Sequence, residues 1–209
     1  GTLLDLSGDP PPWPILQRLI SQTLSALGAL HARNILHLDV KMSNLLLHRR
    51  GPSLSIWLAD LGVARALFDE DEENRIFGTV SYMPAERLRG QYHLWGPQAD
   101  LFSLGVMLFR LLTGHLPFPS LDPREALSQR KQPPIGLRIR PGYAVPQGLD
   151  QVILPLLQYH HADRFDLAAD VIRSLESLPP LTEPPTESLE PILDPDDAAS
   201  SSAPPWPRP

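Results

Sequence analysis

The chain has 209 residues, of which 42% are apolar and 20% charged, which predicts a globular domain with some additional sequence. The absence of cysteine excludes disulfides and thiolate metal sites, and no signal peptide is evident, so we expect a cytoplasmic protein. No apolar run reaches the ~18 residues of a membrane span. The net charge of −6 gives no basic surface, so we expect neither a membrane segment nor a nucleic-acid partner.

The first predicted elements are a helix and a hairpin. Residues 13–33 have apolar side chains at the spacing of a helix with one buried face, and Pro14 suits its first turn. Two short strands, 44–48 and 54–60, follow on either side of the turn-like sequence RRGPS. Because hairpin strands are antiparallel, residues just before the first strand and just after the second lie at the same end.

Helices dominate the rest of the chain. Residues 98–114 are apolar almost all round, which predicts a helix at the centre of the domain that ends at Gly114. Two more helices are expected at 150–160 and 166–178, and Trp57, Trp95 and Phe102 are expected in the core. The predicted fold is therefore mainly α (α+β), a helical bundle with a small β-hairpin over residues 1–178.

Residues 179–209 differ in composition from the preceding sequence. They hold ten of the 25 prolines and six acidic residues against one basic residue, so we expect a disordered, acidic, proline-rich tail. Its PPLTEPP segment could dock on a partner as a polyproline helix, although a solvated linker is the simpler interpretation.

Polar residues cluster at the end of the predicted hairpin. Asp39, Lys41 and Asn44 interrupt the apolar run ILHLDVKMSNLLL, and Asp60 follows the second strand. Carboxylate and amide oxygens suit Mg²⁺, a lysine can neutralise a phosphate, and a second carboxylate can accept a proton. This set predicts phosphoryl transfer.

The order of the motifs resembles that of eukaryotic-type (Hanks-type) serine/threonine protein kinases. HLDVKMSN resembles the catalytic loop, DLG at 60–62 the metal-binding motif, and GTVSYMPAE at 78–86 the segment ending in Ala-Pro-Glu, here with Ala and Pro inverted. DLFSLG at 100–105 and Arg164 in HADRFD complete the series.

The resemblance implies a role for each matched position, with ATP and Mg²⁺ as cofactors and a serine or threonine of a protein as the acceptor. Asp39 would be the catalytic base, Lys41 would contact the transferred phosphate, and Asn44 and Asp60 would hold the metal. Leu46 would form the floor of the adenine pocket, and Thr79 would position the acceptor. The structural residues would be His37, Glu86, Asp100 and Arg164, with Glu86 and Arg164 forming an ion pair.

One departure from the family pattern affects regulation. Leu38 stands where the family has an arginine that reads a phosphorylated residue, and residues 60–78 contain no Ser, Thr or Tyr. We hypothesise that activity does not require phosphorylation between Asp60 and Gly78.

A second departure affects the ATP cleft. The chain contains no G-x-G-x-x-G, and its beginning resembles the segment just after the family's hinge, so we expect only the large C-terminal lobe, without the N-terminal lobe. We also expect the chain alone to bind ATP weakly and to transfer phosphate negligibly.

Two alternatives to a kinase fragment remain open. A kinase-like scaffold or binding module would explain a missing lobe but not the complete polar set. A small-molecule phosphotransferase would share the H-x-D-x-x-x-x-N loop, but Lys41, GTVSYMPAE and DLFSLG argue against it.

Overall fold

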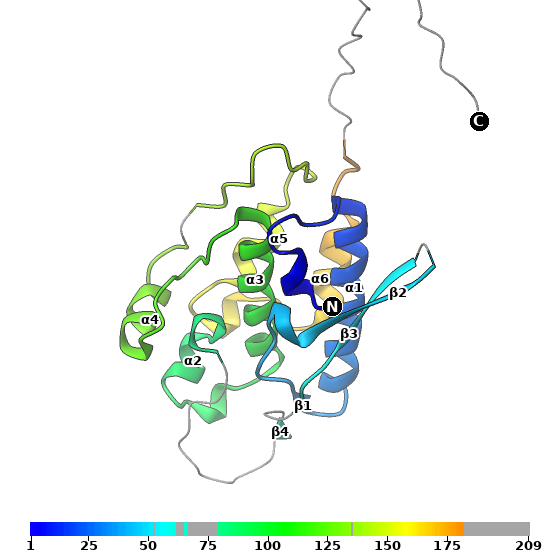
Figure 1. The fold of residues 1–209 in the computed structure, drawn as a ribbon. Helices are drawn as coiled ribbons and strands as arrows, with labels where there is room; N and C mark the ends of the chain where they lie inside the picture. Colours follow the sequence, from blue (N-terminus) through cyan, green and yellow to red (C-terminus); the bar gives the residue numbers. More distant parts are fainter. Residues whose placement is uncertain (52, 62–64, 67–78, 135, 182–209) are drawn as a thin grey trace, which may run out of the picture.

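The computed structural model describes residues 1–51, 53–61, 65–66, 79–134 and 136–181. This part of the chain is mainly helical with two small antiparallel sheets, which confirms the predicted mainly-α fold with a hairpin (Figure 1). None of its helices has the length and apolar character required to cross a membrane.

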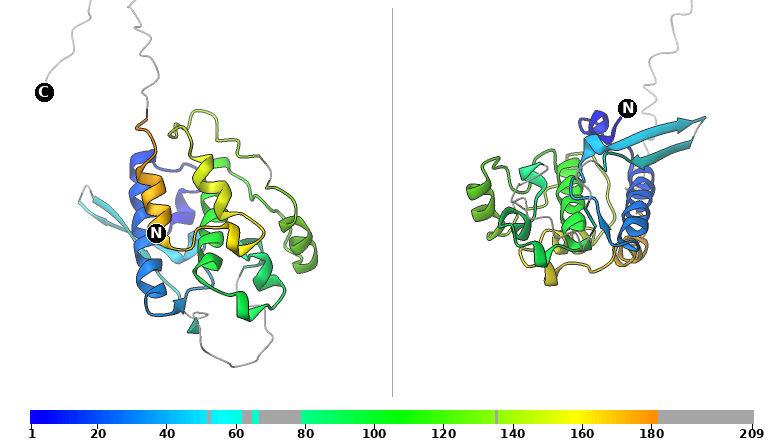
Figure 2. Two further views of the ribbon diagram at one scale, coloured as in Figure 1. Left: turned by 180° about the vertical axis from the view of Figure 1, so that it is seen from behind. Right: turned by 90° about the horizontal axis from the view of Figure 1, so that it is seen from below.

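Helix α1 (Trp13–His31) packs one face against the core, as its sequence period predicts. Pro14 lies in the first turn, where no intrahelical donor is needed. Ile15 is an apolar residue of this helix that lies outside the buried face, at 37% exposed. Helix α6 (Ala168–Glu176) lies alongside α1, as the view from behind shows (Figure 2).

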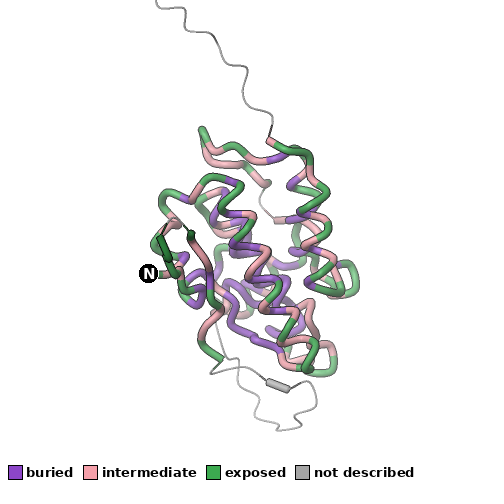
Figure 3. The backbone as a smooth tube through the Cα atoms, turned by 90° about the vertical axis from the view of Figure 1, so that its right-hand side faces the viewer, coloured by how far each residue is buried: buried purple, intermediate pink, exposed green. Residues whose placement is uncertain are grey.

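Helix α3 (Pro97–Thr113) is the centre of the molecule. Every residue from Ala99 to Phe109 is buried, and the helix ends at Gly114, whose φ of +88° is the left-handed conformation that glycine tolerates. Helix α5 (Asp150–Leu156) packs against it. Buried positions lie in the interior and exposed ones on the outer turns (Figure 3).

Strands β2 (Leu45–Arg50) and β3 (Ser53–Leu58) form the predicted hairpin, with Leu45 opposite Leu58. The base of the hairpin lies on α1, and its tip projects from the body (Figure 1). A second two-stranded sheet pairs β1 (Ile35–Leu36) with β4 (Arg65–Ala66). Short 3-10 turns flank these elements: η1 (Leu3–Leu6) and η2 (Met42–Asn44).

A smaller unit lies on the opposite side of α3 from α1 (Figure 1). It contains α2 (Ala85–Leu88) and α4 (Pro123–Arg130), with the turns η3 (Val80–Tyr82) and η4 (Tyr92–Leu94). Met83, Leu88 and Ala126 form an apolar cluster separate from the main core. Helix α4 is absent from the sequence prediction, although Asp122 caps it by accepting from the amides of Arg124 and Glu125, and Pro123 follows at its first position.

The later elements differ from their predicted bounds. Helices α5 and α6 are shorter than the predicted 150–160 and 166–178: α5 ends at Leu156, one residue after Pro155, and the turn η5 (His161–Asp163) lies between the two helices. Leu178 and Leu181 pack against the main core, and the remainder of the expected tail, 182–209, lies outside the described residues. Trp57 is a correction to the predicted core, since it is 62% exposed.

Candidate active site

The loop His37–Asn44 between β1 and β2 is fixed by Asp100 of α3. The fully buried Asp100 carboxylate accepts from the backbone amides of His37 (2.9 Å) and Leu38 (2.7 Å). It also bonds His31 Nε2 at 2.8 Å, at the end of α1. Two helices therefore set the position of one loop, and the DLFSLG motif supplies the anchor.

Leu38 adopts a left-handed conformation, with φ of +63°, that costs a non-glycine residue about 1–3 kcal/mol. Its amide is bound by Asp100, and its carbonyl accepts from the Arg87 guanidinium of α2. These bonds hold Leu38 through both its backbone amide and its backbone carbonyl. A guanidinium therefore lies beside the loop although position 38 lacks one.

Asp39 is 7% exposed, and four donors surround its carboxylate. Lys41 Nζ lies 2.5 Å from Oδ2, and Asn44 Nδ2 lies 3.1 Å from the same oxygen. The Thr79 amide and hydroxyl lie 3.2 and 3.5 Å from Oδ1. The structure thus brings together four of the residues selected from the sequence, one of them 40 positions away along the chain.

The pKa of Asp39 reflects two opposed effects. Burial raises it, but the hydrogen bond and charge of Lys41, with bonds from Thr79 and Asn44, outweigh burial and hold the pKa below its ordinary value. Asp39 is therefore a carboxylate at neutral pH and can accept a proton.

Asn44 and Asp60 lie at the same end of the hairpin. The Ala59 amide donates to the Asn44 carbonyl at 2.8 Å, one step beyond the Leu45–Leu58 pair, which places the adjoining Asp60 beside Asn44. The hydrogen bonds of Asn44 to Asp39 use its amide nitrogen, while its amide oxygen has no partner among the described residues. Asp60 is exposed, and amide and carboxylate oxygens are the kinds of ligand that suit Mg²⁺.

His37 is a buried bridge rather than a free base. Its Nδ1 accepts from the Asp39 amide (3.3 Å), so its Nε2 carries the proton and donates to the Ala59 carbonyl (3.0 Å). The His37 ring thus connects the Asp39 amide in the loop to Ala59, the residue before Asp60.

Leu46 lies on an open face of the hairpin. It is 40% exposed, and its cross-strand partner is the exposed Trp57. Apolar surface of this kind suits the predicted adenine floor.

The segment that contains Thr79 is held by an ion pair that the sequence predicted as Glu86–Arg164. Arg164 Nη1 and Nη2 lie 2.6 and 3.0 Å from the two Glu86 oxygens, and both side chains are buried. Its Nε also donates to the Gln158 carbonyl. The reversal of Ala and Pro before Glu86 leaves this pair intact.

Sequence reasoning missed three residues around the site: His31, Arg87 and Arg130. Arg87 and Arg130 are buried and bind backbone carbonyls, which have no sequence pattern of their own. His31 had a weak signal as the last polar residue of the amphipathic helix.

Several predicted features fall partly outside the described residues. These are Gly62 of DLG, Gly78 of GTVSYMPAE, and most of the segment 60–78 in which no phosphorylation site is expected.

Comparisons with known proteins show the family to which the chain belongs. The protein kinase domain family matches residues 12–174. The chain belongs to the protein kinase domain family. This kinase domain is 35% identical over 173 residues to the serine/threonine-protein kinase PknF of Mycobacterium tuberculosis, covering 78% of this chain and 35% of PknF.

Two further relatives of this kinase domain are bacterial. The probable serine/threonine-protein kinase PknB of Lactococcus lactis is 30% identical, and the matched region covers 75% of this chain and 25% of the length of PknB. The serine/threonine-protein kinase PrkC of Bacillus subtilis is 31% identical, and the matched region covers 73% of this chain and 23% of the length of PrkC. The chain thus spans about a quarter to a third of the length of these relatives.

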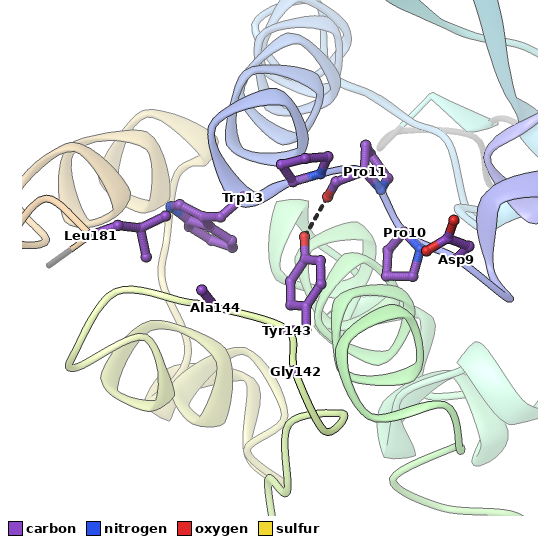
Figure 4. Close-up of a pocket in the computed structure, with 9 residues that line it drawn as sticks. Asp9, Pro10, Pro11, Trp13, Gly142, Tyr143, Ala144 and Leu181 are labelled. Atoms are coloured by element: carbon purple, nitrogen blue, oxygen red, sulfur yellow. Dashed lines mark hydrogen bonds between the residues drawn. The ribbon is translucent and has the colours of Figure 1, made fainter. Parts of the chain in front are cut away.

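A groove of about 470 Å³ lies at the other end of α1 from the loop His37–Asn44. Pro10, Pro11, Trp13, Tyr143 and Leu181 line it (Figure 4). The Tyr143 hydroxyl donates to the Pro11 carbonyl at 2.6 Å and thereby connects the two sides of the groove.

Proposed function

We propose that this chain provides the phosphoryl-transfer loop of a serine/threonine protein kinase, which moves the γ-phosphate of ATP to a protein hydroxyl. The observation that supports this most directly is the Asp39 carboxylate, held by Lys41, Asn44 and Thr79. The three bacterial relatives named above, two serine/threonine-protein kinases and one probable one, agree with it.

The roles of the residues follow from their chemistry. Asp39 accepts the proton of the substrate hydroxyl, since its low pKa keeps it ionised. Lys41, 25% exposed, lies between Asp39 and Thr79 and can offer its charge to the transferred phosphate. Asn44 and Asp60 would hold Mg²⁺, which when bound neutralises charge on the phosphate oxygens. Leu46 would support the adenine, and Thr79 the acceptor.

The proposed choice of serine or threonine as the acceptor rests on Lys41. Lys41 is the residue that the family uses in its serine/threonine members, and its bond to Thr79 at 3.4 Å leaves it beside Asp39. Glu86, Arg164, Asp100 and His37 then act as supports of this arrangement.

The decisive experiment compares two forms of the protein. The first is this chain alone, for which we predict negligible transfer because its sequence has no G-x-G-x-x-G over the phosphates. The second is the chain joined to the N-terminal lobe of PknF. We expect radiolabelled ATP to phosphorylate serine or threonine of a generic protein acceptor in the second form only.

Asp39→Asn is the matched control, because it keeps the shape of the side chain and removes its basicity. We expect this variant of the joined form to lose at least a hundredfold in rate while remaining folded. A folded joined form without transfer would contradict the kinase proposal and favour a scaffold. Transfer by the chain alone would contradict the inactivity prediction.

A further inference from the structure

Arg130, the last residue of α4, is buried at 2% exposure and reaches the turn η3. Its Nε donates to the Met83 carbonyl at 3.0 Å. Its Nη2 donates to the carbonyls of Val80 (3.2 Å) and Ser81 (2.9 Å). One guanidinium thus gathers three carbonyls of a single four-residue turn.

This turn is directly connected to the candidate base. Thr79 precedes η3 as its N-cap, and the Tyr82 amide donates to the Thr79 carbonyl at 2.8 Å. The Thr79 amide in turn donates to Asp39 Oδ1 at 3.2 Å. A short series of hydrogen bonds therefore runs from Arg130 through η3 to Asp39.

The surroundings of Arg130 make it an unusual packing residue. It lies over the rings of Phe118 (4.4 Å) and Phe102 (5.4 Å), and no described carboxylate pairs with it. Burial and the charge of Arg164 lower the pKa of Arg130 to about 9, so it remains a cation at neutral pH. The Nε and Nη2 hydrogen bonds of this buried cation all end on one turn, while its Nη1 has no partner among the described residues, so Arg130 favours the conformation in which those carbonyls converge.

A hydrogen bond from Ser103 to the same turn does not replace those of Arg130. Ser103 Oγ donates to the Tyr82 carbonyl, a fourth acceptor that Arg130 does not use. That contact is a single neutral hydrogen bond, whereas Arg130 provides three charge-assisted ones.

We propose that Arg130 is a positioning residue for phosphoryl transfer: by binding the carbonyls of Val80, Ser81 and Met83 it holds the Thr79 amide against Asp39. The proposal rests on the proposed function of Asp39 as the base, and it links α4 to the reacting end of the loop. Arg130 itself makes no hydrogen bond to Asp39.

The experiment uses Arg130→Met, which keeps most of the volume of the side chain, and Arg130→Lys, which keeps its charge but cannot span three carbonyls. The control is Arg140→Met. Arg140 likewise donates to two backbone carbonyls, those of Ser7 and Gly8, but in a different part of the domain.

The readouts are the backbone amide proton shift of Thr79 and the hydrogen-exchange rate of that amide, both by NMR on this chain. For both Arg130 variants we expect an upfield shift and at least tenfold faster exchange, relative to α1 amides in the same sample. We expect Arg140→Met to lower the thermal midpoint without changing either Thr79 readout.

Two results would overturn the proposal. One is a folded Arg130→Met or Arg130→Lys protein in which the Thr79 readouts are those of the unaltered chain. The other is an equal change in Arg140→Met, which would reduce Arg130 to general stabilisation. Because neither readout requires phosphate transfer, failure of this proposal is distinguishable from failure of the kinase proposal.

Discussion

Asp39 shows how neighbouring groups set the chemistry of a single residue. Burial alone would favour its protonated form, yet Lys41 and the donors around it hold the pKa below 3.8. A carboxyl group with a lowered folded pKa stabilises the fold above its unfolded pKa, and this contribution is lost as the pH falls through the folded value. The same contacts that keep Asp39 ionised therefore stabilise the loop near neutral pH.

Replacement of Lys41 by Met is predicted to raise the pKa of Asp39, because burial then acts without its main counterbalance. Carbon NMR of the Asp39 carboxyl during a pH titration measures this directly. Lys131→Met is the matched control, since Lys131 is exposed and is the other lysine of the chain. Equal titration of Asp39 in the two variants would show that Lys41 has no such effect.

Two helix–helix contacts include a glycine, but only one of them depends on it. A Cβ at Gly105 of α3 would lie 2.7 Å from Leu156 Cβ and 3.2 Å from Leu157 Cδ2, so α3 and α5 could not keep their present separation. A Cβ at Gly28 of α1 would meet Ala168 Cβ of α6 at 3.7 Å, an ordinary contact. The glycine of DLFSLG thus permits close packing, whereas Gly28 does not.

The two alanine substitutions are predicted to have opposite signs. Gly105→Ala should lower the free energy of unfolding by about 1–3 kcal/mol through overpacking. Gly28→Ala should raise it by about 1 kcal/mol, because alanine is the better helix former and space is available. Urea unfolding followed by circular dichroism measures both, and destabilisation by Gly28→Ala would contradict the packing argument.

The whole domain is built on two apolar clusters of unequal size. The main core joins α1, α3, α5 and α6, whereas Met83, Leu88 and Ala126 form a small cluster under α2 and α4. The buried Glu86–Arg164 pair connects the small unit to the large one, and Arg130 of α4 lies over the Phe102 ring of the main core. Polar contacts therefore join the small unit to the rest of the domain, whereas apolar burial holds the large unit together.

Native-state hydrogen exchange is predicted to show lower protection in α2 and α4 than in α1 and α3, because the small cluster buries less apolar surface. Arg164→Met should widen this difference, since removing one partner of a buried ion pair costs about 3–5 kcal/mol. Uniform protection across all four helices would show that the two clusters unfold as one.

The sequence by itself determined the elements whose signals are local. The period of α1, the apolar run of α3 with its glycine stop, and the hairpin all follow from side-chain spacing and turn residues. The loop residues Asp39, Lys41 and Asn44 could also be selected from the sequence, because polar residues in an apolar run are costly to bury unless they are paired. Helix α4 was readable in principle from its Asp-Pro start.

Only the tertiary structure decided how the loop is held. The bonds of Arg87 to Leu38 and of Arg130 to η3 end on backbone carbonyls, and every residue has a carbonyl, so sequence cannot single out the partner. The exposure of Trp57 was likewise undecidable, because an aromatic residue in a strand suits either face until the sheet is packed. Local patterns specify elements, while long-range hydrogen bonds and burial determine which residues meet.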